Sequence, residues 1–326
     1  MSQAPTYSVV IPVFNEEAGL EELYKQLTPV LDVLDGPSEV ILVDDGSRDQ
    51  SFSILKAFAE RDSRFFAVKL SRNFGHQMAL TAGCDFARGE ATITMDSDLQ
   101  DPPRVILEMA QKWREGYELI FAVRRSRAVD TQFKKYSALF FYYILKRLAA
   151  ISAPVNSADF RLVDRKVLKA FQELREKNRY IRGMFSWLGF KQTEVYFDRE
   201  ARFSGETKYP IWKMTKLAFD ALVSFSNAPL RLCMGFGLIM AGVSFLIGIA
   251  TIVGKLWHLG AFVWGWASLF VLISFIGGIH LFMLGVLGEY LARVYDEVRN
   301  RPLYLVSELS GSRFQSHTVE RGEFRS

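Results

Sequence analysis

Carboxylates and an amide oxygen cluster directly after a short apolar run. Residues 91–95 are apolar and rich in β-branched side chains, which predicts a buried strand, and Asp96, Asp98 and Gln100 follow it. Ligands of open α/β sheets bind at the carboxyl ends of the strands. Oxygen ligands at such an edge suit Mg²⁺ or Mn²⁺ carrying a diphosphate. A solvated acidic turn, ended by the two prolines that follow, is the alternative.

Two further polar clusters follow predicted strands, at residues 12–17 (PVFNEE) and 43–47 (VDDGS). The carboxyl ends of parallel strands meet at one sheet edge, so we expect all three clusters to lie together. Asp44 or Asp45 could then accept hydrogen bonds from a base or a ribose, while Asp98 holds the metal. The alternative for residues 43–47 is a turn that caps a helix with Ser47 or Asp49.

The elements that must position these clusters are strands and helices in alternation. Strands are predicted at residues 7–13, 39–43, 65–70, 91–95 and 119–123, and helices at 16–34, 49–61, 75–87 and 104–114, with Asn73 capping the third. This alternation predicts a mostly parallel sheet with helices on both faces. Neither a Gly-x-Gly-x-x-Gly turn after the first strand nor a Walker loop is present, which disfavours the dinucleotide and P-loop folds.

Composition excludes other classes of protein. The chain has 326 residues, 49% of them hydrophobic, and a net charge of +4. No block of Lys and Arg and no nucleic-acid motif occurs, so no nucleic-acid partner is expected. The cysteines, Cys84 and Cys233, lie in unlike surroundings, which predicts no disulfide and a reducing compartment. No cleavable signal peptide is expected from the first residues.

Two long uncharged runs, at residues 232–254 and 256–288, predict two transmembrane helices, the second best placed at 267–288. A buried helix pair is the alternative. Basic residues flank both runs and the loop between them carries only Lys255, so both termini and the N-terminal domain are expected in the cytoplasm. Glycines in the spans could pack the two helices together or form an oligomer interface.

Other segments are expected near the membrane surface. Residues 131–151 and 211–230 combine aromatic and basic side chains and could lie in the headgroup plane. For the first of them, a core-facing amphipathic helix is an equal alternative. The tail from Ser307 onward is polar and is expected to be poorly ordered.

The motifs together resemble a known family. Residues 10–16 (VIPVFNE), 43–47 (VDDGS) and 96–102 (DSDLQDP) are similar to the family-2 inverting glycosyltransferases of GT-A fold. Residues 72–75 (RNFG), 156–161 (NSADFR), 202–209 (RFSGETKY) and the two spans resemble polyisoprenyl-phosphate glycosyltransferases, which include bacterial undecaprenyl-phosphate glucosyltransferases and dolichol-phosphate mannose synthase. The absence of Gln-x-x-Arg-Trp speaks against polymerising synthases.

The resemblance implies a Rossmann-like GT-A domain at residues 1–209, an interfacial helix at 210–230, two transmembrane helices within 231–290 and a cytoplasmic C-terminal segment at 291–326. It implies transfer of a hexose, glucose from UDP-glucose, to undecaprenyl phosphate with Mg²⁺ or Mn²⁺, at the cytoplasmic face of a bacterial inner membrane. A homo-oligomer, up to a tetramer, is also expected.

Roles are assigned to residues in three groups. The donor is expected to contact Pro12, Val13, Asn15, Glu17, Asp44, Asp96, Ser97 and Arg124. The metal ligands are expected to be Asp98 and Gln100, with Asp96 shared between metal and donor. The basic loop of Arg202, Ser204, Thr207 and Lys208 is expected to hold the acceptor phosphate, unless it is simply a solvated loop.

Asp96 and Asp159 are the expected catalytic residues. Asp159 is either a base or an orienting group, because a phosphate monoester is already largely ionised at neutral pH, and a turn cap before Arg161 is its structural alternative. His76 is interpreted as a helix-surface residue. GDP-mannose or a modified UDP-arabinose could replace the donor, and a degenerate membrane scaffold is the alternative of a different class.

Overall fold

The computed structural model describes residues 4–125, 157–198, 228–257 and 266–312. It divides into two compact units, one of Met1–Lys146, Ala150–Tyr209 and Arg301–Ser326, the other of Arg147–Ala149 and Pro210–Asn300. The predicted surface segment at 131–151 and the basic loop at 202–208 lie outside the described residues. So does the segment predicted at 211–230, except for residues 228–230, which begin a long helix.

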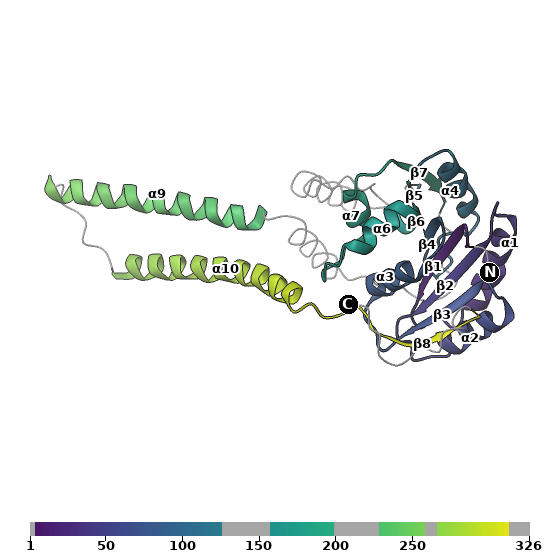
Figure 1. Ribbon diagram of the computed structural model, residues 1–326. Helices are drawn as coiled ribbons and strands as arrows, with labels where there is room; N and C mark the ends of the chain where they lie inside the picture. The colour runs from purple at the N-terminus through teal and green to yellow at the C-terminus, as the bar shows by residue number, and fades with distance from the viewer. Residues whose placement is uncertain (1–3, 126–156, 199–227, 258–265, 313–326) are drawn as a thin grey trace. The chain divides into compact units, whose positions relative to one another are not determined.

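The first unit is built on a mixed sheet that is mostly parallel in its centre. Its strand order among the described residues is β7-β5-β6-β4-β1-β2-β3-β8 (Figure 1). The strands are β1 (Tyr7–Val13), β2 (Ser38–Asp44), β3 (Phe65–Leu70), β4 (Ala91–Thr94), β5 (Leu119–Arg124), β6 (Ser157–Asp164), β7 (Gln192–Phe197) and β8 (Val306–Ser310). The neighbours β4, β1, β2 and β3 are parallel, as are β5 and β7, whereas β6 is antiparallel to β4 and β5. The prediction of a mostly parallel α/β sheet is confirmed, although β6, β7 and β8 were not predicted.

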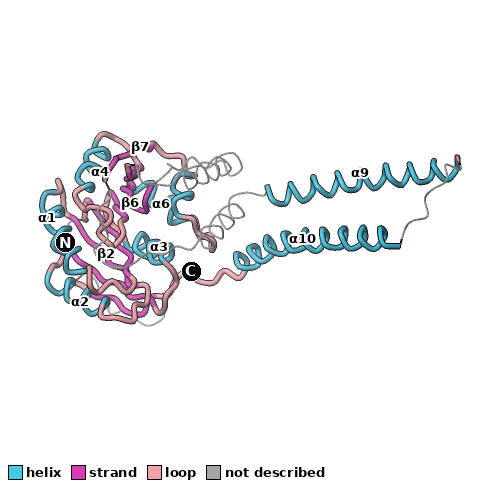
Figure 2. The backbone as a smooth tube through the Cα atoms, turned by 180° about the vertical axis from the view of Figure 1, so that it is seen from behind, coloured by secondary structure: helices cyan, strands magenta, loops and turns pink. Residues whose placement is uncertain are grey.

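Helices flank the strands of this unit (Figure 2). They are α1 (Leu20–Val33), α2 (Ser51–Arg61), α3 (His76–Phe86), α4 (Val105–Arg114), α6 (Arg165–Glu173) and α7 (Ile181–Trp187). Side chains of α1, α2 and α4 pack with Val9 and Ile11 on one face of β1. On the other face α3 lies so close that a Cβ at Gly83 would stand 2.1 Å from Cγ1 of Val10. Because alternate residues of a strand point to opposite faces, the expected helix layers on both faces are present.

The start of α1 and the cap of α3 differ from the prediction. Helix α1 begins at Leu20 rather than at residue 16, and the amides of Glu16 and Glu17 donate instead to the side chains of Ser51 and Asp49. The N-cap of α3 is Gly75, at φ 99°, with no side-chain cap, so the predicted cap at Asn73 is wrong.

The C-terminal segment was expected to be poorly ordered from Ser307, and this is wrong for its first part. Residues 306–310 form β8, which pairs antiparallel with β3. Tyr304 donates a hydrogen bond to Asp85 at 2.8 Å, and Lys56 pairs with Glu308 at 2.9 Å. The chain that follows the second long apolar helix therefore becomes an edge strand of the sheet.

The second unit consists of two long helices in its described part, α9 (Ala228–Leu256) and α10 (Trp266–Val298). The predicted run at 232–254 lies within α9, and the part of the second run predicted as the better span, 267–288, lies within α10. By length and composition, one described segment is apolar enough to cross a membrane, Phe275–Val298 of α10. A Cβ would meet nothing within 4 Å at the described glycines of the two helices, so these do not serve close contact between α9 and α10 of one chain; they are Gly235, Gly237, Gly242, Gly277, Gly278, Gly285 and Gly288.

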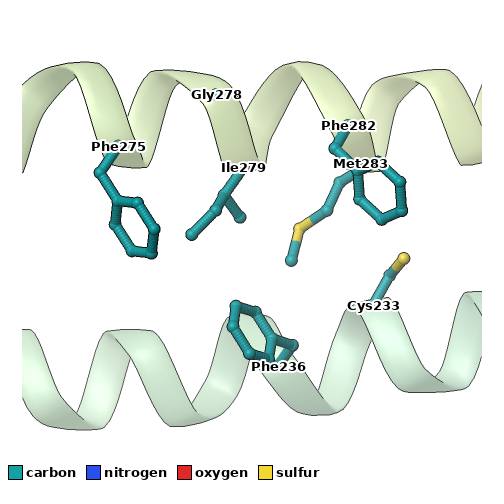
Figure 3. A pocket seen from close by; sticks show the side chains of 7 residues that line it. All are labelled: Cys233, Phe236, Phe275, Gly278, Ile279, Phe282 and Met283. Atoms are coloured by element: carbon teal, nitrogen blue, oxygen red, sulfur yellow. The ribbon is translucent and has the colours of Figure 1, made fainter.

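A cavity of about 730 Å³ lies between α9 and α10 (Figure 3). Its lining is apolar and consists of Cys233, Phe236, Phe275, Gly278, Ile279, Phe282 and Met283. None of these lining side chains is charged, so the cavity offers no group for acid–base or metal chemistry. Both cysteines are free thiols, which confirms that they form no disulfide.

Candidate active site

The turns after β1 and β2 are joined by hydrogen bonds. The amide of Asn15 donates to Oγ of Ser47 at 3.0 Å, and Oδ1 of Asn15 accepts from the amide of Arg48 at 2.9 Å. Oε2 of Glu17 accepts from the amide of Gln50 at 2.8 Å. The expected donor residues Asn15 and Glu17 therefore hold the two turns together, which places Pro12 and Val13, at the end of β1, beside Asp44.

Asp44 and Asp45 have different surroundings. Asp44 is fully buried, and burial raises its pKa although Ser47 donates to its Oδ2. Its Oδ1 has no hydrogen-bond partner within the described part of the chain. Asp45 accepts from the amides of Phe74 and Gly75, at 2.7 and 2.9 Å. Asp45 thereby fixes the start of α3, and Asp44 keeps unused acceptor capacity.

The glycine that follows Asp44 and Asp45 is required, because the turn packs closely against the loop before α3. Gly46 has φ 71°, and a Cβ there would lie 2.5 Å from the carbonyl carbon of Arg72. Because glycine has no Cβ, the turn after β2 can pack directly against the backbone of the Arg72–Gly75 loop. The first helical residues of α3, His76 and Gln77, are consequently held at the same edge as the predicted clusters.

The antiparallel pairing of β4 with β6 brings the two expected catalytic acids together. Thr94 pairs with Arg161 in this register, and the register continued by two residues sets Asp96 opposite Asp159. Oγ1 of Thr94 donates to the backbone carbonyl of Asp159 at 2.6 Å. Nε2 of His76 lies 3.5 Å from Oδ1 of Asp96 and 3.5 Å from Oδ2 of Asp159. One imidazole thus lies within ion-pair distance of both carboxylates.

Asp159 is surrounded by donors. Nη2 of Arg161 lies 2.5 Å from its Oδ1, and Nε2 of Gln77 donates to its Oδ2 at 3.3 Å. Nη2 of Arg182 is 3.9 Å from Oδ1. Burial alone would raise the pKa of Asp159, but the hydrogen bond with His76 and the charges of Arg161 and Arg182 outweigh it and lower the pKa strongly. Asp159 is therefore an ionised, oriented carboxylate and not a turn cap.

Asp96 differs from Asp159 in its electrostatics. Burial raises its pKa to about 6, against the lowering effect of His76. The pKa of His76 is raised, because the attraction of Asp159 and Asp96 exceeds the opposing effect of burial. His76 keeps 44% of its side chain exposed. It is nevertheless a member of the site, so its interpretation as a helix-surface residue was incomplete.

The loop after β4 presents the expected metal ligands. Oδ1 of Asp98 accepts from the amide of Gln100 at 3.1 Å, and Leu99 between them has φ 58°. No three His, Cys, Asp or Glu side chains converge as a metal cluster within the described ranges. Mg²⁺ is commonly held by one or two carboxylates together with substrate phosphates. Asp96 and Asp98 fit a cation that arrives with a diphosphate better than a cation held by protein alone.

The last two residues predicted to contact the nucleotide-sugar donor are Arg124 and Ser97. Nη2 of Arg124 donates to Oδ1 of the fully buried Asp101 at 3.1 Å. Ser97 is buried at the end of β4. Arg124 thus ties the end of β5 to the loop after β4, and part of its hydrogen-bonding capacity is used inside the protein.

Comparison with known proteins decides the family. The model of the family described as "Glycosyl transferase family 2" matches residues 8–171, a range that contains every residue of the carboxylate site except Arg182. The chain belongs to glycosyl transferase family 2.

Two of the similar proteins match nearly the full chain. An uncharacterized glycosyltransferase of Bacillus subtilis is 46% identical, covering 95% of this chain and 96% of its own. The SfII prophage-derived bactoprenol glucosyl transferase of Shigella flexneri is 38% identical, covering 92% of this chain and 97% of its own.

Among solved structures, glucosyl-3-phosphoglycerate synthase from Mycobacterium tuberculosis, in complex with Mn²⁺, UDP and glucosyl-3-phosphoglycerate, is 19% identical to this chain. The match covers 67% of this chain and 78% of that one, with a TM-score of 0.45.

In this family-2 glycosyltransferase, sequence reasoning missed four residues that contact the site acids, namely His76, Gln77, Arg161 and Arg182. Two signals could have found some of them. Arg161 stands two residues after Asp159 on one strand, so both point to the same face. His76 and Gln77 open the helix after β3, whose carboxyl end shares the ligand edge. No sequence signal pointed to Arg182. The acceptor residues Arg202, Ser204, Thr207 and Lys208 lie outside the described residues.

Proposed function

We propose that this family-2 glycosyltransferase moves a hexose, glucose from UDP-glucose, onto undecaprenyl phosphate with inversion at the anomeric carbon. The observation that carries the proposal is the pair of carboxylates, Asp96 and Asp159, joined through His76 at the ligand edge of the sheet. The relatives named bactoprenol glucosyl transferase, similar over nearly the full chain, support a lipid carrier as acceptor.

The donor would lie over the joined turns after β1 and β2. Pro12, Val13 and the Asn15–Ser47 contact would form the floor for the nucleoside, and Oδ1 of Asp44 offers an acceptor if the turn shifts to expose it. Asp96 and Ser97 would face the sugar diphosphate, and Arg124 would add a cationic group at the end of β5. Asp98, Gln100 and Asp96 would hold Mg²⁺ or Mn²⁺, which would neutralise charge on the departing diphosphate.

Asp159 acts as an orienting carboxylate in this proposal. Its strongly lowered pKa makes it a weak base, and a phosphate monoester with a second pKa near about 6 needs little help to lose its proton. Fixing the attacking oxygen and the sugar in reactive geometry is the larger contribution. His76 would keep Asp159 and Asp96 at a set separation during the reaction.

The membrane arrangement is also a proposal. Two spans, in α9 and α10, would leave the catalytic domain and both termini in the cytoplasm, with residues 202–208 holding the acceptor phosphate and residues 211–230 at the membrane surface. The open glycine faces of α9 and α10 are available for contact with other copies of the chain, in agreement with a homo-oligomer.

A donor screen tests the proposed function. The purified full chain in lipid vesicles is given undecaprenyl phosphate with UDP-glucose, GDP-mannose or a modified UDP-arabinose, with and without a chelator. We expect transfer from UDP-glucose that the chelator abolishes. Transfer from another donor alone would change the sugar, and transfer that persists in the chelator would remove the metal. No transfer from any donor would favour a membrane scaffold.

A further inference from the structure

Arg161 is the closer of the two described arginines that form ion pairs with Asp159. Arg161 contacts Oδ1 of Asp159 at 2.5 Å, and Gln77 donates to Oδ2 at 3.3 Å. Arg161 has no exposed surface, so it cannot reach a ligand. The contact of Arg182 with the same carboxylate is long, at 3.9 Å. The ion pair that holds Asp159 is therefore the one with Arg161.

Arg182 has hydrogen-bonding capacity to spare. A guanidinium has five N–H donors, and Nε of Arg182 is buried with no hydrogen-bond partner among the residues that the structure describes. A quarter of the side chain is exposed. Arg182 stands in the first turn of α7, and the neighbouring amide of Ile181 is bonded to Gln77 at 3.1 Å. The backbone that carries Arg182 is thus anchored to the active-site helix.

Arg182 is a cation of the site that is only loosely paired with a carboxylate. Arg161 neutralises Asp159, and Arg124 is paired with Asp101. Of the two described arginines that form ion pairs with Asp159, Arg182 is the one with an exposed surface. Both substrates of the proposed reaction present phosphate oxygens, which arginine binds with two parallel hydrogen bonds.

We propose that Arg182 is a phosphate-binding residue of the active site. Its ligand is a phosphate oxygen, of the donor diphosphate or of the acceptor monophosphate, held beside Asp159. This inference rests on the proposed function for the identity of the substrates. It adds a cation to the site from a segment beyond residue 171, where the family match ends.

Binding measurements test this assignment. The full chain in detergent is titrated with UDP and, separately, with a short-chain polyprenyl monophosphate, at fixed Mg²⁺. Arg182→Gln and Arg182→Ala are compared with Lys169→Gln, which removes the same charge from an exposed position of α6. We expect the Arg182 variants to bind one of the two ligands about tenfold more weakly or worse, the loss typical of a missing charged hydrogen bond, while Lys169→Gln binds both normally.

The ligand that is lost identifies the source of the phosphate. Weaker UDP binding assigns Arg182 to the donor, and weaker polyprenyl phosphate binding assigns it to the acceptor. The comparison uses whichever Arg182 variant keeps the wild-type unfolding temperature. Such a variant binding both ligands as tightly as wild type would overturn the proposal. Wild-type protein that binds both ligands but transfers no sugar would instead contradict the proposed function, and the assignment of Arg182 would stand.

Discussion

Replacing Asp159 with Asn separates the role of its charge from that of its shape. The substitution keeps the side chain's size but removes the carboxylate that faces Arg161, which is fully buried. Removing one partner of a buried ion pair costs about 3–5 kcal/mol of stability. Asp159 keeps 15% of its side chain exposed, so we expect a loss of about 3 kcal/mol, the lower end of that range.

Turnover of the folded Asp159→Asn protein should fall by about 100-fold or more, the loss expected when the reacting groups are no longer held in reactive geometry. The affinity for UDP should change little, because the nucleotide is expected over the turns after β1 and β2. Transfer of radiolabelled sugar measures turnover, and chemical unfolding measures stability.

Asp62→Asn is the matched control for this experiment. Asp62 has 13% of its side chain exposed and contacts Arg64 at 2.8 Å, away from the ligand edge. It should lower stability without lowering turnover per folded molecule. Turnover of folded Asp159→Asn equal to that of Asp62→Asn would refute the reasoning and remove Asp159 from the site.

Three further outcomes are expected. Asp98→Asn should raise the Mg²⁺ concentration needed for half-maximal transfer while leaving the unfolding temperature unchanged; an unaltered metal titration would contradict Asp98 as a ligand. Gly83→Ala should destabilise the fold by about 1–3 kcal/mol through overpacking, because a Cβ there would lie 2.1 Å from Val10, and a thermal unfolding curve identical to wild type would contradict this packing. Tyr304→Phe removes a hydrogen bond to Asp85 and should cost about 0.5–1.5 kcal/mol, measured by denaturant unfolding; no loss would show that the C-terminal segment does not depend on this contact.

Strands that coincide with an uninterrupted apolar run could be predicted from the sequence. Strands β1 and β3 begin and end where their apolar runs do. Strand β6 could not be recognised, because its centre carries Asp159 and the buried Arg161, which interrupt the apolar pattern. Strand β8 has only five residues, of mostly polar type, and its pairing with β3 depends on a contact made over more than two hundred residues of chain.

Site residues that directly follow an apolar strand could be predicted from the sequence. Site residues that tertiary contacts bring together could not. Asp96 was expected at a sheet edge because an apolar strand precedes it. Its contact with His76 follows from the start of α3, which is fixed by Asp45 and so has no local signal. Arg182 reaches the site from a short helix whose sequence neighbours do not suggest chemistry.

The anomeric configuration of the product tests the central claim most directly. The purified full chain in vesicles is incubated with UDP-glucose, whose glucose is α-linked, and undecaprenyl phosphate, and the lipid product is examined by NMR. Inverting transfer predicts a β-linked glucosyl phosphate lipid. An α-linked product, or UDP release without any lipid-linked sugar, would contradict the account.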